Sequence, residues 1–188
     1  MKPVLAALIC GCPQSGKTTK ALELARQEAL ETGFPVLALD PGRVRQLEDI
    51  PEAESFRELV YAVWDRGTHS RICPESEESW NRVWTAIRKL GRCIVLVDEA
   101  RFFVNAFKMS LPAVLATRVL NHLRVSIILT TQSYGDLPRS LSSVATELHV
   151  FRCTAPRDLE RLREDYGLDP AEIAALPQYT CKVVKVGF

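Results

Sequence analysis

The sequence predicts an α/β fold, with a mainly parallel central sheet and helices on both of its faces. Three observations predict it. Short apolar runs alternate with helical patterns, the apolar runs are continuous, and a glycine-rich phosphate-binding pattern joins the first run to the first helix. Continuous apolar strands are typical of parallel sheets, because helices cover both sides of such sheets. The length of 188 residues suits one domain, so we expect residues 1–188 to form a single domain.

Six apolar runs are the expected strands of this sheet. They are Val4–Cys10, Pro35–Asp40, Cys93–Asp98, Ser126–Thr131, Glu147–Phe151 and Cys181–Val186. Between residues 41 and 78 the pattern weakens, because Pro, Gly and acidic residues interrupt it. We interpret this segment as an irregular insertion with short helices, which is not a second domain.

The expected helices follow from the spacing of their apolar residues. Within Ser79–Leu90 the apolar residues form one stripe along a helix, which predicts packing against the core: Trp80, Val83, Trp84, Ile87 and Leu90. The other expected helices are Lys17–Glu31, a stretch within Leu111–Leu123, and Pro156–Tyr166.

The first strand leads into a loop whose composition suits phosphate binding. It matches the pattern G-x-x-x-x-G-K-[ST] in the run Gly11-Cys12-Pro13-Gln14-Ser15-Gly16-Lys17-Thr18, followed by Thr19. Glycines let the backbone wrap tightly, so that its N–H groups point at an anion, and the helix N-terminus adds partial positive charge. Lys17 is expected to reach the outer phosphates, and Thr18 to offer its hydroxyl to Mg²⁺. The pattern therefore predicts a polyphosphate site.

A second acidic motif stands at the end of an expected strand. Four apolar residues, 94–97, precede Asp98 and Glu99. Ligands of open α/β sheets lie at the carboxyl ends of the strands, so both carboxylates are expected beside the phosphates. Asp98 would hold Mg²⁺ directly or through water, and Glu99 would orient and polarise the water that attacks the γ-phosphate.

A third strand carries polar residues at its end. The apolar residues 127–129 lead into Thr130, Thr131 and Gln132. A polar side chain at this position can sense the γ-phosphate, and Gln132 could hydrogen-bond the phosphate or the attacking water.

Composition limits the remaining possibilities. The net charge of +1 predicts no strong global attraction to nucleic acid, although basic residues gather within 101–140 and acids within 48–58. Six scattered cysteines include no C-x-x-C pair, so we expect no structural zinc and a reducing, cytoplasmic setting. No apolar run approaches the ~20 residues of a transmembrane helix, and no signal-peptide pattern is seen.

Taken together, these motifs resemble the FtsK–HerA superfamily of DNA-pumping ATPases. The resemblance rests on the phosphate loop, residues 96–99 with their acidic pair, the strand ending at Thr130-Thr131-Gln132, and the segments 136–141, 151–159 and 176–177 with the terminal strand. The size of the chain is similar to that of the genome-packaging ATPases of tailless icosahedral viruses with an internal membrane. This resemblance implies a RecA-like (ASCE) P-loop NTPase fold that uses ATP and Mg²⁺.

The resemblance further implies a ring of five or six subunits, with ATP between neighbours and double-stranded DNA in the pore. A capsid vertex or portal protein would be a partner. The chain would lie in the host cytoplasm and could associate with the virion vertex. Such rings complete each site with an arginine from the adjacent subunit. In relatives a basic residue commonly stands just before the third strand, and Asn121 is the residue of this chain at that position. The candidates for the arginine are therefore Arg124, Arg118 and Arg139, of which Arg124 is preferred. Basic residues in expected loops would contact DNA phosphates: Arg43, Arg45 and Lys108.

Two other functions stay open. The runs 15–19 and 98–103 are also similar to deoxynucleoside kinases of the thymidine kinase type, in which Glu99 would deprotonate a nucleoside hydroxyl. Those enzymes typically carry a four-cysteine zinc site, which this sequence lacks. A non-catalytic nucleotide switch is the third alternative, and Glu99 argues against it, because a switch gains little from a catalytic carboxylate.

Overall fold

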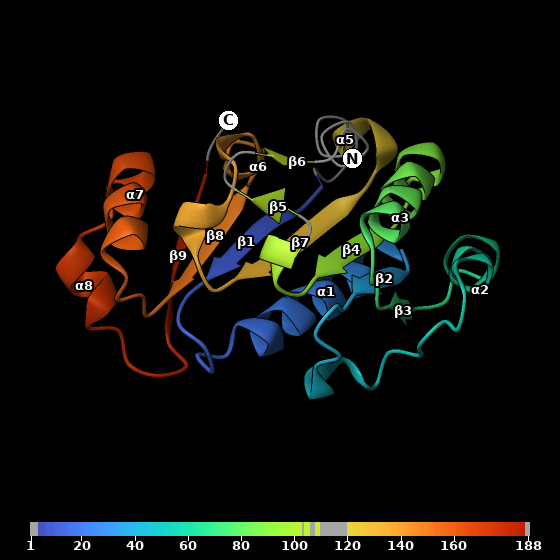
Figure 1. Ribbon diagram of the computed structural model, residues 1–188, viewed down its shortest axis with the longest axis horizontal. Helices are drawn as coiled ribbons and strands as arrows, with labels where there is room; N and C mark the ends of the chain where they lie inside the picture. Colours follow the sequence, from blue (N-terminus) through green and yellow to red (C-terminus); the bar gives the residue numbers. More distant parts are fainter. Residues whose placement is uncertain (1–3, 103, 106–107, 110–119, 187–188) are drawn as a thin grey trace.

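The computed structural model describes residues 4–102, 104–105, 108–109 and 120–186. Its centre is a seven-stranded sheet in the order β3-β2-β4-β7-β1-β8-β9 (Figure 1). Neighbouring strands are parallel except for β8 and β9, which are antiparallel. The strands are β1 (Ala6–Cys10), β2 (Val36–Leu39), β3 (Ser70–Ile72), β4 (Ile94–Val97), β7 (Ser126–Thr131), β8 (Glu147–Phe151) and β9 (Cys181–Lys185). The predicted mainly parallel sheet is confirmed.

Helices cover both faces of this sheet. They are α1 (Lys17–Thr32), α2 (Phe56–Val60), α3 (Glu77–Leu90), α5 (Leu120–Leu123), α6 (Arg139–Ser142), α7 (Pro156–Tyr166) and α8 (Pro170–Ala174). Shorter elements are η1 (Arg45–Leu47), η2 (Tyr61–Asp65), η3 (Ala100–Phe102), η4 (Tyr134–Asp136) and the hairpin of β5 (Val104–Asn105) with β6 (Lys108–Met109). Within the described ranges, every helix lacks the length or the apolar character that crossing a bilayer requires.

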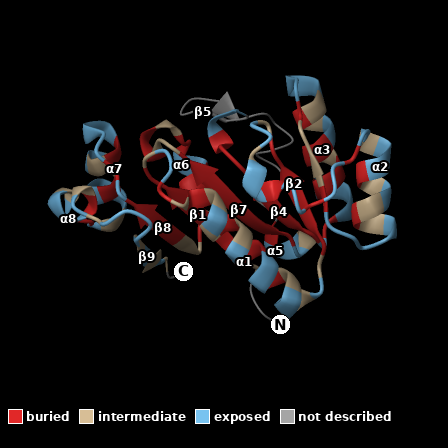
Figure 2. Ribbon diagram, turned by 90° about the horizontal axis from the view of Figure 1, so that it is seen from below, coloured by how far each residue is buried: buried red, intermediate tan, exposed pale blue. Residues whose placement is uncertain are grey.

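Two apolar cores lie on opposite faces of the sheet. One contains the buried side of α1 and alternate residues of β1, β2 and β4. The other contains four residues of the predicted stripe of α3, residues of α5 and α6, and the intervening residues of the same strands. The fifth residue of the predicted stripe, Leu90, is 46% exposed, because it is the last residue of the helix. Figure 2 shows the strands as the most buried layer, with exposed residues on the outer sides of the helices. Alternate side chains of a strand point to opposite faces, so continuous apolar strands fill both cores.

The segment 41–78 contains short helices, as predicted, and also one strand that the sequence did not reveal. Strand β3 has three residues and pairs in parallel with β2 at the edge of the sheet. Only one of its residues, Ile72, is apolar, so it gives no apolar run. Helix α3 also begins two residues earlier than predicted, because Ser76 caps it and accepts a hydrogen bond from the Ser79 amide at 3.2 Å.

Candidate functional site

The phosphate-binding pattern forms the tight turn between β1 and α1. Gly11, Gln14 and Gly16 have φ angles of 149°, 58° and 100°, which L side chains rarely adopt. The Nζ atom of Lys17 donates hydrogen bonds to the carbonyl oxygens of Gly11 at 2.9 Å and Cys12 at 2.7 Å. The lysine ammonium is therefore positioned by the loop itself.

Strand β8 supports this loop from one side. A Cβ atom built on Gly11 would lie 2.6 Å from the Cβ atom of Phe151, so only glycine fits there. The Cys12 amide donates to the carbonyl of Arg152 at 2.8 Å. Ser15 is buried, and its Oγ is among the described buried atoms that have no hydrogen-bond partner. An orphaned hydroxyl in a loop of left-handed residues fits a site for phosphate oxygens.

Thr18 and Asp98, the two residues predicted to hold Mg²⁺, meet at the beginning of α1. The Thr18 hydroxyl donates to Asp98 Oδ1 at 2.9 Å, and the Thr130 hydroxyl donates to the same oxygen at 3.0 Å. Thr130 Oγ1 also accepts from the Glu99 amide at 2.8 Å. A hydroxyl and a carboxylate held together supply the hard oxygen ligands that Mg²⁺ requires. The described residues contain no group of three His, Cys, Asp or Glu side chains that could hold a metal ion.

Glu99 is buried beside this pair in a left-handed conformation, with φ of 56°. Its Oε1 accepts from the backbone amide of Gln132 at 3.3 Å and lies 3.5 Å from Nε of Arg101. Burial raises the pKa of Glu99, while the Gln132 amide and the Arg101 charge oppose that rise. A carboxylate with a raised pKa is a stronger proton acceptor than an ordinary surface glutamate.

Lys17 shares the electrostatic field of the two carboxylates. Burial lowers the pKa of Lys17, and the negative charges of Glu99 and Asp98 act in the opposite direction. The site therefore contains one buried ammonium group and two buried carboxylates that interact electrostatically, at the carboxyl ends of the parallel strands. This is where α/β sheets bind their ligands.

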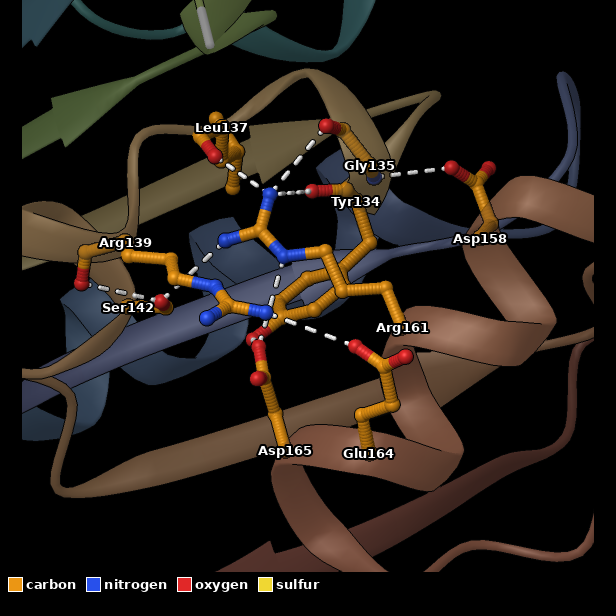
Figure 3. Close-up of polar contacts among 9 residues, drawn as sticks. All are labelled: Tyr134, Gly135, Leu137, Arg139, Ser142, Asp158, Arg161, Glu164 and Asp165. Atoms are coloured by element: carbon orange, nitrogen blue, oxygen red, sulfur yellow. Dashed lines mark hydrogen bonds and ion pairs between the residues drawn. The ribbon is translucent and has the colours of Figure 1, made fainter.

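The chain beyond Gln132 is fastened to helix α7. Asp158 is buried, and its Oδ1 accepts from the Ser133 hydroxyl at 2.8 Å and the Gly135 amide at 2.8 Å. The guanidinium of Arg161 donates to the carbonyl oxygens of Tyr134, Gly135 and Leu137 (Figure 3). Five groups of the turn after β7 are thus hydrogen-bonded to one helix, and this turn directly follows Gln132.

Sequence reasoning missed three of these contributors. Thr130 was recognised as part of the polar strand end, but not as the hydroxyl that joins Asp98 to the Glu99 backbone. The sequence feature that could have identified this role is a threonine directly after the apolar residues 127–129. Asp158 and Arg161 lie three residues apart on α7, which places them on one face of that helix. Their partners in this turn are backbone groups, which leave no trace in the sequence, except for the Ser133 hydroxyl.

The predicted arginines stand away from the loop of their own chain or lie outside the described residues. Arg124 precedes β7, at the end opposite to Gln132, and its guanidinium lies 5.0 Å from the centre of the Phe34 ring. Arg118 and the side chain of Lys108 lie outside the described residues. Arg139 is 75% exposed and pairs with Glu164 at 3.4 Å. Arg124 and Arg139, the two candidates that the structure describes, thus make these contacts away from the phosphate loop of their own chain.

The two predicted DNA contacts whose side chains the structure describes, Arg43 and Arg45, are both exposed. Arg43 is 62% exposed and pairs with Glu52 at 3.3 Å, while Arg45 is exposed in η1. Glu52 also pairs with Arg71 at 3.0 Å. The acidic residues of segment 48–58 therefore neutralise part of the neighbouring basic charge.

Comparison with solved structures adds the fold relationships. The chain is similar to the genome-packaging NTPase B204 from Sulfolobus turreted icosahedral virus 2 in complex with ATP-gammaS, with a TM-score of 0.84, 18% identity, and coverage of 99% of this chain and 94% of that one. For B204 in complex with sulfate the TM-score is 0.83 at 17% identity, with 99% and 93% covered. The fold is that of a RecA-like P-loop ATPase. The predicted resemblance to small genome-packaging ATPases is thus confirmed at the level of the fold.

A more distant similarity extends to a bacterial protein. The N-terminal domain of zonular occludens toxin from Neisseria meningitidis gives a TM-score of 0.52 at 19% identity, with 79% of this chain and 76% of that chain covered. No protein-family model matches the chain, and a search of curated proteins gives no match either.

Proposed function

We propose that this chain is an ATP-hydrolysing, DNA-translocating motor that packages double-stranded viral DNA into a preformed capsid. One observation carries the proposal: Lys17, Thr18, Asp98 and Glu99 converge at the carboxyl edge of the sheet. The support for packaging is the fold shared with B204, a genome-packaging NTPase.

In this proposal each residue has one chemical role. Lys17 and the loop amides neutralise the phosphates, and Thr18 with Asp98 would hold Mg²⁺, which supplies further neutralisation of phosphate charge. A water molecule attacks the γ-phosphorus and passes its proton to Glu99, while the bond from phosphorus to the bridging oxygen breaks and ADP leaves. The raised pKa of Glu99 supports the base role, because it improves proton acceptance.

The motor would work as a ring of five or six subunits around double-stranded DNA. An arginine of each neighbour would stabilise the charge that develops on the transferred phosphoryl group. The position of Arg124 supports its action on the site of a neighbouring subunit, because it lies at the opposite end of β7 from Gln132 of its own chain. Lysine and arginine in loops would contact DNA phosphates without reading sequence, so DNA binding would weaken steeply with salt. A capsid vertex or portal protein would be the further partner.

The first experiment measures phosphate release from ATP with and without double-stranded DNA, using the wild type, Glu99→Gln and the exposed control Glu160→Gln. Hydrolysis that DNA stimulates, that Glu99→Gln abolishes and that Glu160→Gln retains would support the motor. Thymidine is included as an acceptor. Phosphate moved to thymidine, with little free phosphate, would make the chain a kinase and overturn the motor.

A mixing experiment tests the arginine in trans. Lys17→Ala disables the loop but keeps the arginines, whereas Arg124→Ala, Arg118→Ala or Arg139→Ala removes one arginine but keeps the loop. Each arginine variant should bind nucleotide, and the variant of the true finger should not hydrolyse ATP alone. Mixing it with Lys17→Ala should restore activity, because mixed rings contain sites with both parts. If all three arginine variants hydrolyse ATP at the wild-type rate, the arginine in trans is wrong.

A further inference from the structure

The catalytic groups fix the direction in which a bound nucleotide must run. Asp98 and Glu99 follow β4, and Thr130 lies in the last two residues of β7, so these groups all lie on one side of β1. The strand order continues on the other side of β1 with β8 and β9. A γ-phosphate near Glu99 and a β-phosphate in the loop direct the nucleoside across the beginning of α1, toward β8 and β9.

Two aromatic side chains stand on that side of the loop. A Cβ atom built on Gly16 would lie 3.4 Å from Cδ1 of Tyr179 and 3.5 Å from Cε1 of Phe151. Phe151 ends β8 and is 3% exposed, whereas Tyr179 is 69% exposed. The buried ring thus supports the loop, and the exposed ring borders the last glycine of the phosphate-binding pattern.

The position of Tyr179 is fixed by its connection to the sheet. It belongs to the loop between α8 and β9, in which the Thr180 amide donates to the Pro177 carbonyl at 3.2 Å. Two residues later, Cys181 pairs with Phe151 in the antiparallel register of β9 and β8. This pairing brings residues 177–180 beside the phosphate loop, although they follow its last residue, Thr18, by 159 or more positions in the sequence.

The backbone at Tyr179 is strained. Its φ angle is 63°, in the left-handed region that bulky residues rarely adopt and that costs of order 1 kcal/mol. Burial of the ring does not offset that cost, because most of the ring faces solvent. Strained, exposed residues next to a ligand site are typical of ligand contacts.

We propose that Tyr179 is the platform on which the base of the bound nucleotide stacks. The inference rests on the proposed nucleotide function and adds the residue that holds the base. Every base has a π-face, so a tyrosine platform accepts several bases, and purines gain more than pyrimidines because they cover more of the ring. The chain should therefore bind ADP and GDP more tightly than CDP and UDP.

The test compares ADP with tripolyphosphate, which carries phosphates but no base, by isothermal titration calorimetry at fixed Mg²⁺. Tyr179→Ala should weaken ADP binding by about 5- to 100-fold and leave tripolyphosphate binding unchanged. Tyr179→Phe keeps the ring and should bind ADP within about twofold of the wild type. The matched control is Tyr61→Ala, which removes a tyrosine that is 48% exposed in η2, on the other edge of the sheet.

Two results would overturn the platform. Unchanged ADP affinity in Tyr179→Ala would show that the ring does not contact the base. Equal losses for ADP and tripolyphosphate would show that the ring supports the loop instead. A wild type that binds neither ligand would contradict the proposed function as well, so the two failures are distinguishable.

Discussion

Replacing Thr130 with valine tests whether its hydroxyl organises the two acidic residues. Valine has the same shape but cannot hydrogen-bond, so the substitution removes a donor to Asp98 Oδ1 at 3.0 Å and an acceptor for the Glu99 amide at 2.8 Å. All three residues are buried, so water cannot replace either bond readily.

The expected cost follows from these two bonds. A buried amide without a partner costs about 1–3 kcal/mol, and a hydrogen bond to a charged group contributes about 1.5–3 kcal/mol. Asp98 keeps the bond from Thr18 at 2.9 Å, which favours the lower part of the combined range. We therefore expect Thr130→Val to lower the free energy of unfolding by about 3 kcal/mol.

Urea unfolding measures that loss, and ATP turnover over a range of Mg²⁺ concentrations measures the effect on the site. The matched control is Thr131→Val, because Thr131 is the buried neighbour and, among the described residues, its hydroxyl bonds within its own turn, to the backbone of Ser133 at 3.1 and 3.3 Å. We expect the control substitution to lower the free energy of unfolding by about 1 kcal/mol. Equal losses for the two variants, with unchanged Mg²⁺ dependence, would refute the role given to Thr130.

Three further predictions concern other parts of the structure. Gly11→Ala should destabilise the fold by about 3 kcal/mol or more in thermal unfolding, because its Cβ would lie 2.6 Å from Phe151. Arg161→Met should cost about 3 kcal/mol in urea unfolding, since three backbone carbonyls lose their donor, whereas exposed Arg163→Met should cost less than 0.5 kcal/mol. Glu99→Gln should raise the melting temperature at neutral pH. Because burial raises the pKa of Glu99, its ionised form costs stability above that pKa, and the difference from Gln should vanish as the pH falls toward the ordinary glutamate value; a constant difference would contradict this.

Much of the fold could be predicted from the sequence, because its strands are continuous apolar runs and its longer helices carry apolar stripes. Strands β7 and β8 and helix α7 have the predicted bounds. Strand β3 escaped prediction because it lies at the edge of the sheet, where one of its three residues is apolar. Edge strands take their structure from pairing with a neighbour, and a local pattern does not record that pairing.

Some residues of the candidate site could likewise be predicted from the sequence, and others could not. The residues of the phosphate loop and the acidic pair follow fixed local spacings, so they could be selected from the sequence, and the structure brings Thr18 and Asp98 together. The contact of Glu99 is with the backbone amide of Gln132, and the side-chain role predicted for Gln132 stays a prediction. Tyr179 could not be predicted beside the loop, because antiparallel pairing of β9 with β8 brings it there from a distant part of the chain.

The bonds between α7 and the turn after β7 have a mechanical consequence. Asp158 Oδ1 accepts hydrogen bonds from the Ser133 hydroxyl and the Gly135 amide, both at 2.8 Å. The end of β7 therefore cannot shift by more than a fraction of an ångström unless these hydrogen bonds break or α7 moves with it. Helix α8 packs on α7, and the chain leaves α8 directly for the loop of Tyr179. The turn after Gln132 and the loop of Tyr179, which lie on opposite sides of the phosphate loop, are thus connected through α7 and α8. A shift of that turn that keeps its hydrogen bonds would have to move α7 and the helix packed on it.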